Sequence, residues 1–285
     1  MPADIDCLQI VAGSHVPQVN LHQASQMETD LMTLPKTPSF SVAGKRALVA
    51  GASSGIGRAC AAALGEKGAA VTLMARRASA LDAIADEMRQ AGMTTNILPI
   101  DITDIDRMRT SIAAEGPFDI LVNSAGVARH SSATQTTPED FDFVANLNFK
   151  SAYFLTQAVA KGLIKSKKAG SLINISSQMA LVGGIDRAVY AATKHAVEGF
   201  TKSMAIEWGA YGIRVNTICP TFIMTPLTLP TFENPKRRQW IEDKIKLGRV
   251  GTVEDIMGAV QFLASDAAAL VTGSALIVDG GWTAD

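Results

Sequence analysis

A tyrosine and a lysine four residues apart are the clearest sign of chemistry in this sequence. Tyr190 and Lys194 stand in YAATK, within a segment whose pattern predicts a helix, so their side chains share one helical face. A free tyrosine has a pKa of about 10 and is a poor base at neutral pH. A neighbouring ammonium favours the phenolate, so this pair could act as a general acid/base. The alternative is a tyrosine at the edge of the core beside a solvated lysine.

A second stretch, GASSGIG, concentrates glycine between the strand pattern RALVA and the helix pattern IGRACAAALGEKG. In such a turn, backbone N–H groups and the positive end of the helix can hold a pyrophosphate. Gly51 would permit a tight turn, Gly55 a close approach to the phosphates, and Gly57 close packing of helix on strand. The spacing alone also fits a plain glycine-rich turn, and its place between strand and helix favours the phosphate site. Two serines in the turn add hydroxyl donors, Ser53 and Ser54.

The hydrophobic pattern predicts the scaffold that must position these groups. Seven short runs are almost continuously apolar, as expected of strands covered on both faces, and most intervening stretches are long enough for crossover helices. This alternation predicts an α/β fold with one doubly wound parallel sheet. The predicted strands are 46–50, 70–75, 95–100, 118–123, 171–176, 213–218 and 275–279.

The amino-terminal segment differs from the rest. Residues 1–39 show no sustained period, contain several prolines and lack the pattern of a secretory signal. We expect a tail or arm there, with a partner-docking arm as the alternative, and a single catalytic domain over residues 40–285.

Composition excludes several classes of function. Basic and acidic residues nearly cancel, 26 against 27, so nothing suggests nucleic acid or an anionic membrane as partner. No apolar run is long enough to predict a transmembrane helix. Three scattered cysteines suit a reducing cytoplasm, and the histidines and cysteines show no metal-ligand spacing. We therefore expect a cytoplasmic protein without a structural metal.

Further motifs follow the glycine turn in a fixed order. NSAG (123–126) closes the fourth predicted strand, ISS (175–177) closes the fifth, and VNTICPTFIMT (215–225) covers the end of the sixth. With G-x3-G-x-G and Y-x-x-x-K, they resemble the short-chain dehydrogenase/reductase (SDR) family from about Phe40 to the C-terminus. The resemblance implies a Rossmann-type fold with seven parallel strands and an NAD(P)-dependent oxidoreductase. The sequence departs from the family pattern at two positions, Ala50 in place of threonine and Thr221 in place of glycine. Both positions bear on local loop geometry and not on the chemistry.

The resemblance also implies a role for each catalytic position. Tyr190 gives or takes the proton while a hydride passes between nicotinamide and a carbonyl carbon. Lys194 tunes Tyr190 and binds the nicotinamide ribose. Ser177, at the carboxyl end of its strand, hydrogen-bonds the substrate oxygen. Ser176 is the alternative candidate for this role. Ser177 is preferred because it lies thirteen residues before Tyr190, as in the family.

An asparagine completes this set. Asn148, in VANLNFKSAYF, matches the family's helix asparagine, which holds a water in the proton relay. Asn146, two residues away, would point elsewhere on a helix, so we prefer Asn148.

The end of the second strand bears on the coenzyme. In NAD-binding units an acid there grips the ribose diol, but this strand ends in Ala75, followed by Arg76 and Arg77. An arginine can pair with a 2′-phosphate, so we expect NADP(H) to be preferred and NAD(H) to be possible, with Arg76 as the phosphate reader. Alternatively, both arginines cap the next helix. Asp101 matches the family's adenine-contacting aspartate or caps a helix. The expected coenzyme positions are Gly51, Ser53, Ser54, Gly55, Ile56, Gly57, Arg76, Asp101, Ile102, Asn123, Ala125, Gly126, Tyr190, Lys194, Pro220, Ile223 and Thr225.

The substrate pocket is less well defined by sequence. A variable lid is expected over about 221–248, and its basic cluster 236–238 either attracts an anion or forms a solvated helix face. Polar groups near the site favour a sugar acid or polyol as substrate; a 3-oxoacyl thioester or a simple ketone is the alternative, and a non-catalytic coenzyme-binding module is a further one. The expected substrate residues are Arg129, His130, Gln178, Met179 and Gly183.

Two helical segments suggest self-association. Residues 148–165 and 190–208 place small residues beside apolar ones, which permits close helix approach. In the family these helices build a dimer face, so the resemblance implies a homotetramer or a homodimer, whereas packing within one subunit is the alternative.

Overall fold

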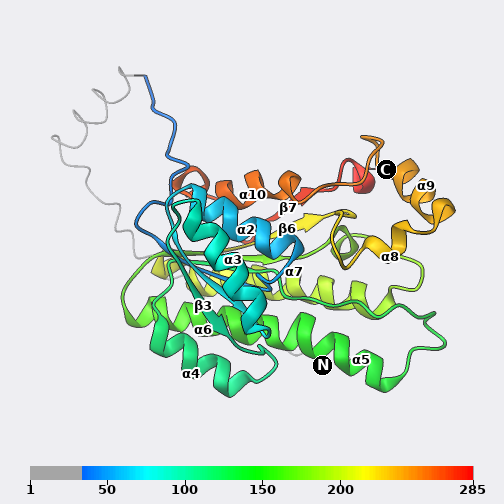
Figure 1. Cartoon of the computed structure of the whole chain (residues 1–285), viewed down its shortest axis with the longest axis horizontal. Coiled ribbons are helices and arrows are strands. Elements are labelled where there is room, and N and C mark those ends of the chain that lie inside the picture. Colours follow the sequence, from blue (N-terminus) through cyan, green and yellow to red (C-terminus); the bar gives the residue numbers. More distant parts are fainter. Residues whose placement is uncertain (1–33, 285) are drawn as a thin grey trace, which may run out of the picture. The chain divides into compact units, whose positions relative to one another are not determined.

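All seven predicted strands are present, and they pair in parallel into one sheet with the order β3-β2-β1-β4-β5-β6-β7 (Figure 1). The five central strands are almost wholly buried because helices cover both faces, which explains their continuous apolar runs, whereas the two strands at the edges of the sheet are partly exposed. Their bounds lie within two residues of those predicted. They are β1 Arg46–Ala50, β2 Ala70–Ala75, β3 Thr95–Pro99, β4 Ile120–Asn123, β5 Gly170–Ile175, β6 Ile213–Pro220 and β7 Ala275–Val278.

The helices form a layer on each face of the sheet, and each layer has its own hydrophobic cluster. One cluster joins the sheet to α2 (Gly55–Glu66), α3 (Ala78–Gln90) and α10 (Glu254–Ala264). The other joins it to α4 (Ile105–Glu115), α6 (Ala152–Lys165) and α7 (Ala188–Trp208). The doubly wound Rossmann-type fold expected from the sequence is therefore confirmed.

The strand order reverses between β1 and β4, where the chain has wound outward to β3 and then returned. In open α/β sheets, ligands bind in the crevice at the carboxyl ends of the strands beside such a switch point. The turn after β1, with its three glycines, and the NSAG segment after β4 both lie there.

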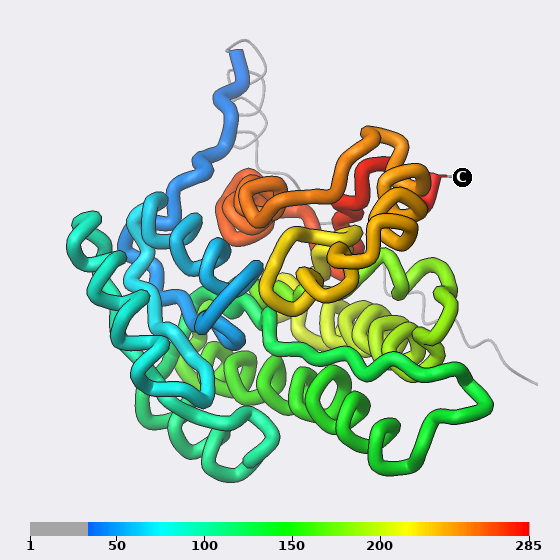
Figure 2. The backbone as a smooth tube through the Cα atoms, turned by 45° about the vertical axis from the view of Figure 1, so that its right-hand side comes forward, coloured from blue at the N-terminus to red at the C-terminus, as the bar shows by residue number. Residues whose placement is uncertain are grey.

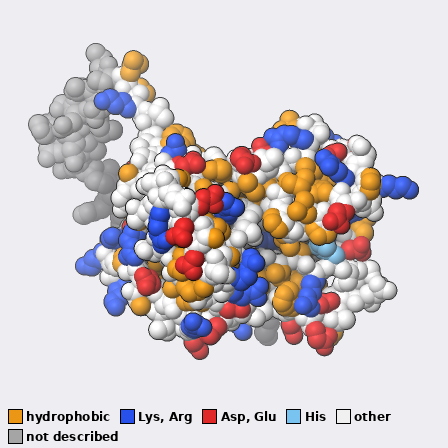
Figure 3. Space-filling view, viewed as in Figure 1, with side chains coloured by type: hydrophobic (Ala, Val, Ile, Leu, Met, Phe, Trp, Pro, Cys, Tyr) orange, Lys and Arg blue, Asp and Glu red, His pale blue; other side chains and the backbone are white. Residues whose placement is uncertain are grey.

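The lid expected over 221–248 contains two helices, α8 (Leu229–Phe232) and α9 (Pro235–Lys244). It has its own small hydrophobic cluster, to which Trp282 adds. The Trp282 ring lies 5.6 Å from those of Phe222 and Trp240, measured between centroids. Figure 2 shows this yellow-to-orange segment beside the red C-terminal turn. Hydrophobic side chains gather over the segment that follows β6, while charges of both signs are interspersed elsewhere on the same face (Figure 3).

The computed structural model describes residues 34–284, and the described residues from Pro38 onward form one compact unit. The arm predicted over residues 1–39 therefore falls almost entirely outside the described residues. No helix between residues 34 and 284 is long and apolar enough to cross a membrane. Within the same residues, no group of three or more histidine, cysteine, aspartate or glutamate side chains could hold a metal ion.

Candidate active site

The glycine turn after β1 brings three backbone segments into close contact. Gly51 has a φ of +75°, and a Cβ there would lie 2.7 Å from the backbone nitrogen of Ala125. A Cβ on Gly57 would lie 2.2 Å from the carbonyl oxygen of Gly51, so only glycine allows α2 to start so near the strand. Ser54 occupies the N-cap position of α2 without a side-chain hydrogen bond, which leaves the first N–H groups free to bind an anion.

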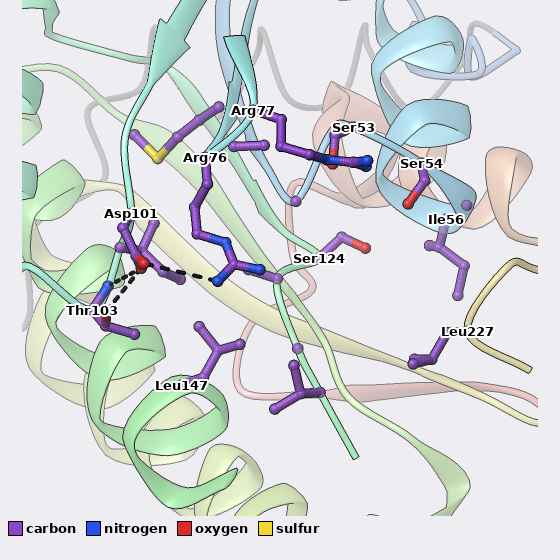
Figure 4. Close-up of a pocket in the computed structure, with 18 of the residues that line it drawn as sticks. Ser53, Ser54, Ile56, Arg76, Arg77, Asp101, Thr103, Ser124, Leu147 and Leu227 are labelled. Atoms are coloured by element: carbon purple, nitrogen blue, oxygen red, sulfur yellow. Dashed lines mark hydrogen bonds and ion pairs between the residues drawn. The ribbon is translucent and has the colours of Figure 1, made fainter. Parts of the chain in front are cut away.

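A cavity of about 640 Å³ lies beside this turn, at the switch point of the sheet (Figure 4). Most of the residues predicted to bind the coenzyme line it: Gly51, Ser53, Ser54, Gly55, Ile56, Arg76, Asp101, Ile102, Ala125, Gly126 and Thr225. The other predicted positions do not contribute to its lining, namely Gly57, Asn123, Tyr190, Lys194, Pro220 and Ile223. Asn123 instead fixes the loop after β4, since its Oδ1 accepts from the Ala125 N–H at 3.2 Å.

The two arginines after β2 both line this cavity, and their side chains point in different directions. Figure 4 shows Arg76 directed toward Asp101 and Arg77 directed toward Ser53. The Arg76 guanidinium lies 4.0 Å from the Asp101 carboxylate, and its side chain is 74% exposed. Arg77 stands at the N-cap position of α3 without a side-chain capping bond. Both guanidinium groups are therefore placed to meet an anionic ligand.

Asp101 forms a local turn rather than a helix cap. Its Oδ1 accepts from the backbone N–H of Thr103 at 2.9 Å and from the Thr103 hydroxyl at 2.8 Å. The N-cap of α4 is Asp104, which accepts from the Arg107 N–H at 3.1 Å. The carboxylate of Asp101 thus faces the cavity that the coenzyme residues line.

The tyrosine and lysine predicted to be catalytic lie on the first turns of α7. The Lys194 side chain is buried, and its Nζ donates to the carbonyl oxygen of Ile175 at 2.9 Å. This fixes Nζ 5.6 Å from the centroid of the Tyr190 ring. Ser177 follows β5 and lines a second pocket together with Tyr190, whereas the neighbouring Ser176 does not line it. The structure therefore brings the tyrosine, the lysine and the preferred serine to one place.

Asn148 lies in a π-helical turn, Asn146–Ser151, between α5 (Pro138–Ala145) and α6. Its Oδ1 accepts from the Val127 N–H at 2.9 Å, and its Nδ2 donates to the Val127 carbonyl at 2.8 Å. A Cβ on Gly126 would lie 3.4 Å from this Oδ1 and 3.9 Å from the Lys194 ammonium. The asparagine and the lysine thus flank one glycine. Asn146 points elsewhere and lines the larger cavity.

The second pocket has a volume of about 100 Å³ and adjoins the larger one through Leu227, which lines both. Two of its residues carry buried polar atoms without a hydrogen-bond partner among the described residues: Oε1 of Gln178 and Oγ1 of Thr221. Its lining residues are Ala128, His130, Ser177, Gln178, Met179, Arg187, Tyr190, Thr221, Phe222, Leu227, Thr228 and Thr231.

Three of the five predicted substrate residues line this pocket: His130, Gln178 and Met179. Gly183 does not line it, nor does Arg129. The Arg129 guanidinium pairs with Asp140 instead and lies 3.9 Å from the centroid of the Phe143 ring. The position of Arg129 shortly after NSAG indicated that the residue lies near the pocket. It could not indicate which way the side chain points.

Arg187, which the sequence analysis left unassigned, also lines this pocket. Its guanidinium contacts the ring of His130. The His130 side chain remains in contact with solvent, but partial desolvation lowers its pKa to about 4, and the positive charges of Arg187 and Arg237 contribute to the shift. The one signal in the sequence was a charged residue three positions before Tyr190, just ahead of the helix.

The basic residues 236–238 on the lid helix α9 differ in what they contact. Arg238 pairs with Glu242 at 2.9 Å, one helical turn away. The Arg237 guanidinium lies 4.5 Å from the centroid of the Trp240 ring, and its charge acts on His130. The cluster is thus a largely exposed helix face whose charge still reaches the pocket.

Comparisons with known proteins agree with this geometry. The model of a family described as enoyl-(acyl carrier protein) reductase matches residues 51–283. D-erythrulose reductase of Gallus gallus is 38% identical over 245 residues, which cover 86% of this chain and 98% of the relative. Gluconate 5-dehydrogenase of Gluconobacter oxydans (strain 621H) is 36% identical over 248 residues, with coverage of 86% and 96%.

A solved structure is similar over almost the same extent. Gluconate 5-dehydrogenase of Burkholderia cenocepacia J2315, in complex with NADP and tartrate, superposes with a TM-score of 0.83 at 33% identity. The match covers 86% of this chain and 98% of that one. With the glycine turn, the tyrosine–lysine pair and the parallel sheet in place, this chain belongs to the short-chain dehydrogenase/reductase family of NAD(P)-dependent oxidoreductases.

Proposed function

We propose that this enzyme oxidises or reduces a polyhydroxylated substrate, a sugar acid, polyol or sugar, with NADP(H) as the preferred coenzyme. The observation that carries the proposal is the set of polar groups in the largely apolar pocket beside the tyrosine. It combines the hydroxyls of Ser177 and Tyr190 with the unpartnered Oε1 of Gln178 and Oγ1 of Thr221.

Unpartnered polar atoms favour a substrate rich in hydroxyl groups. A buried donor or acceptor left without a partner costs about 1–3 kcal/mol, and a substrate hydroxyl can both donate and accept. An acyl chain or a simple ketone would leave these atoms unpaired. The relatives named for D-erythrulose and gluconate support the same substrate class.

The larger cavity fits a nicotinamide coenzyme that carries a 2′-phosphate. Its walls offer the free N–H groups of the glycine turn to a pyrophosphate, and Asp101 to the adenine side. Ala75 has no side-chain acceptor for a ribose diol, whereas Arg76 and Arg77 provide positive charge. The NADP in the Burkholderia relative supports the same preference. We infer that NADP(H) is preferred and that NAD(H) is used less well.

The coenzyme, when bound, supplies or accepts the hydride at the carbon that bears the reacting oxygen. In reduction, the Tyr190 hydroxyl would give its proton to that oxygen, and in oxidation the phenolate would take the proton back. Ser177 would donate a hydrogen bond to the same oxygen, which gains negative charge in the transition state of reduction. Lys194, held by the Ile175 carbonyl, keeps a positive charge beside the Tyr190 ring. Asn148 would hold a water molecule in the proton relay that links the site to solvent.

Self-association is part of the proposal. Phe149 is 41% exposed, and its ring stacks on that of Phe200 at 6.4 Å between centroids. Phe200 itself is buried, so the exposed part of this pair is the Phe149 ring, and exposed aromatic surface suits a protein–protein contact. We infer a homotetramer, with a homodimer as the smaller alternative, and a cytoplasmic location. A monomeric mass by light scattering at micromolar concentration would exclude the assembly.

The test is an initial-rate assay at 340 nm with NADP(H) and NAD(H) against polyols, sugar acids, ketoses, simple ketones and a 3-oxoacyl thioester. We expect turnover of a polyhydroxylated class with NADP(H), which Tyr190→Phe should reduce by at least ~100-fold. The variant should still bind coenzyme, because Tyr190 does not line the coenzyme cavity. Turnover of the thioester or a simple ketone alone would contradict the substrate class. Coenzyme binding without any turnover would favour a non-catalytic module.

A further inference from the structure

We propose that Arg187 binds a carboxylate on the substrate, so that the enzyme favours sugar acids over neutral polyols of the same configuration. This inference rests on the proposed function, because it concerns the same pocket and narrows its substrate class. Three features of Arg187 carry it: its position, its lack of a counter-ion and the charge around it.

Arg187 lines the same pocket as the proposed catalytic groups. The residue stands at the N-cap position of α7, three residues before Tyr190, and lines the pocket together with Tyr190 and Ser177. Its Cζ lies 6.0 Å from the centroid of the Phe222 ring, which belongs to the segment that follows β6. A substrate whose reacting oxygen meets Tyr190 would therefore bring its other groups toward Arg187.

The Arg187 guanidinium has no carboxylate partner. Arg58, Arg89, Arg129, Arg238 and Arg249 each pair with an acidic side chain. No such ion pair joins Arg187 to any acid among residues 34–284, although the charge of the adjacent Asp186 acts on it. Its polar neighbour is the imidazole of His130 instead.

Burial makes this missing partner costly. Arg187 is half-buried, and burial lowers the pKa of its guanidinium, with the charge of Arg237 acting in the same direction. A partly desolvated cation without a counter-ion gains most from an anionic ligand. His130 cannot supply the negative charge, because imidazole is neutral or cationic. The pocket thus carries an excess of positive charge that a substrate carboxylate would balance.

A carboxylate fits this group better than a hydroxyl does. The planar guanidinium can donate two parallel hydrogen bonds to the two carboxylate oxygens, whereas a hydroxymethyl group offers one neutral oxygen. A hydrogen bond to a charged group is worth enough to change affinity by about 10- to 100-fold. The remaining polar atoms of the pocket would serve the hydroxyl groups that both kinds of substrate share.

The test compares substrate pairs that differ only at the terminal carbon: threonate with threitol, xylonate with xylitol, and gluconate with glucitol. Initial rates with NADP⁺ give kcat/KM for each compound. Calorimetry with the NADPH-bound enzyme gives their affinities without turnover, because reduced coenzyme and an alcohol cannot react. We expect at least one acid to bind about 10-fold or more tightly than its polyol.

The variants separate a role in recognition from a role in folding. Arg187→Gln should abolish the preference for the acid and change the affinity for the polyol less than about 3-fold, while Arg187→Lys should keep part of the preference. The matched control is Arg238→Gln, which removes the same charge from the lid helix at a residue that lines neither cavity and pairs with Glu242. This control should keep the preference, and melting temperatures should show that all three variants fold.

The outcomes distinguish this inference from the proposed function. Equal affinities of the wild-type enzyme for acid and polyol in all three pairs would overturn the inference, as would equal losses for both in Arg187→Gln. Turnover of a polyol that depends on Tyr190 would then leave the proposed function intact. A preference for the acid in binding, without turnover of any compound, would support the role of Arg187 and contradict the proposed function.

Discussion

Replacement of Arg76 by alanine tests how the enzyme selects its coenzyme. The Arg76 guanidinium lies in the coenzyme cavity, and its nearest acidic partner is Asp101 at 4.0 Å. An exposed ion pair contributes between about 0 and 1 kcal/mol, so Arg76→Ala should hardly change the free energy of unfolding. The substitution should instead weaken the binding of the coenzyme that carries the 2′-phosphate.

The expected magnitude follows from exposure. A hydrogen bond to a charged group contributes about 1.5–3 kcal/mol. Because the Arg76 side chain is 74% exposed, water competes for the phosphate and the lower end of that range applies. About 1.5 kcal/mol corresponds to roughly a 10-fold loss in kcat/KM for NADP(H). NAD(H), which lacks the phosphate, should change less than about 2-fold.

Initial rates at 340 nm with both coenzymes measure the effect, and Arg77→Ala is the matched variant. Arg77 lines the same cavity but is directed toward Ser53. If Arg77→Ala loses NADP(H) activity and Arg76→Ala does not, Arg77 is the phosphate reader. If the ratio of NADP(H) to NAD(H) activity stays unchanged in both variants and in the double variant, the charge-based account of coenzyme preference is refuted.

Three other predictions follow from single contacts. Gly57→Ala should lower the free energy of unfolding by about 1–3 kcal/mol and weaken coenzyme binding, because its Cβ would lie 2.2 Å from the Gly51 carbonyl; denaturant titration and coenzyme fluorescence measure both. Asn148→Ala should destabilise the fold by about 2–4 kcal/mol, because it unpairs the N–H and carbonyl of Val127, and an unchanged urea midpoint would contradict this. His130 should titrate near pH 4 by NMR, so stability should fall as the pH drops from about 6.5 to 4, where the unfolded chain binds the proton more readily. A midpoint near 6.5 would contradict the effect of partial desolvation and of the neighbouring Arg187 charge on its pKa.

The strands were predictable because parallel strands buried on both faces have continuous apolar runs. The glycine turn was predictable for a related reason. Gly51 and Gly57 meet backbone atoms at distances that exclude any Cβ, so the fold restricts these positions to glycine. In both cases a local pattern of residues reflects a constraint that the backbone imposes directly.

The substrate pocket was less predictable because side-chain direction depends on partners far away in the sequence. Arg129 follows the NSAG segment, yet it turns to Asp140, eleven residues further on. The π-helical turn around Asn148 inserts an extra residue into what the pattern presents as one continuous helix. Arg187 lies in a loop without periodicity, and its partner His130 is 57 residues distant.

The small hydrophobic cluster of the lid has a consequence for how enzymes of this kind diversify. Phe232, Ile241, Ile245 and Val250 pack with one another and with Trp282, apart from the two clusters that hold the sheet. Substitutions at these four cluster residues therefore change packing contacts that lie outside the two clusters of the sheet. A change of shape on the substrate side of the lid can therefore arise from these residues without repacking the helices that hold Tyr190 and Lys194.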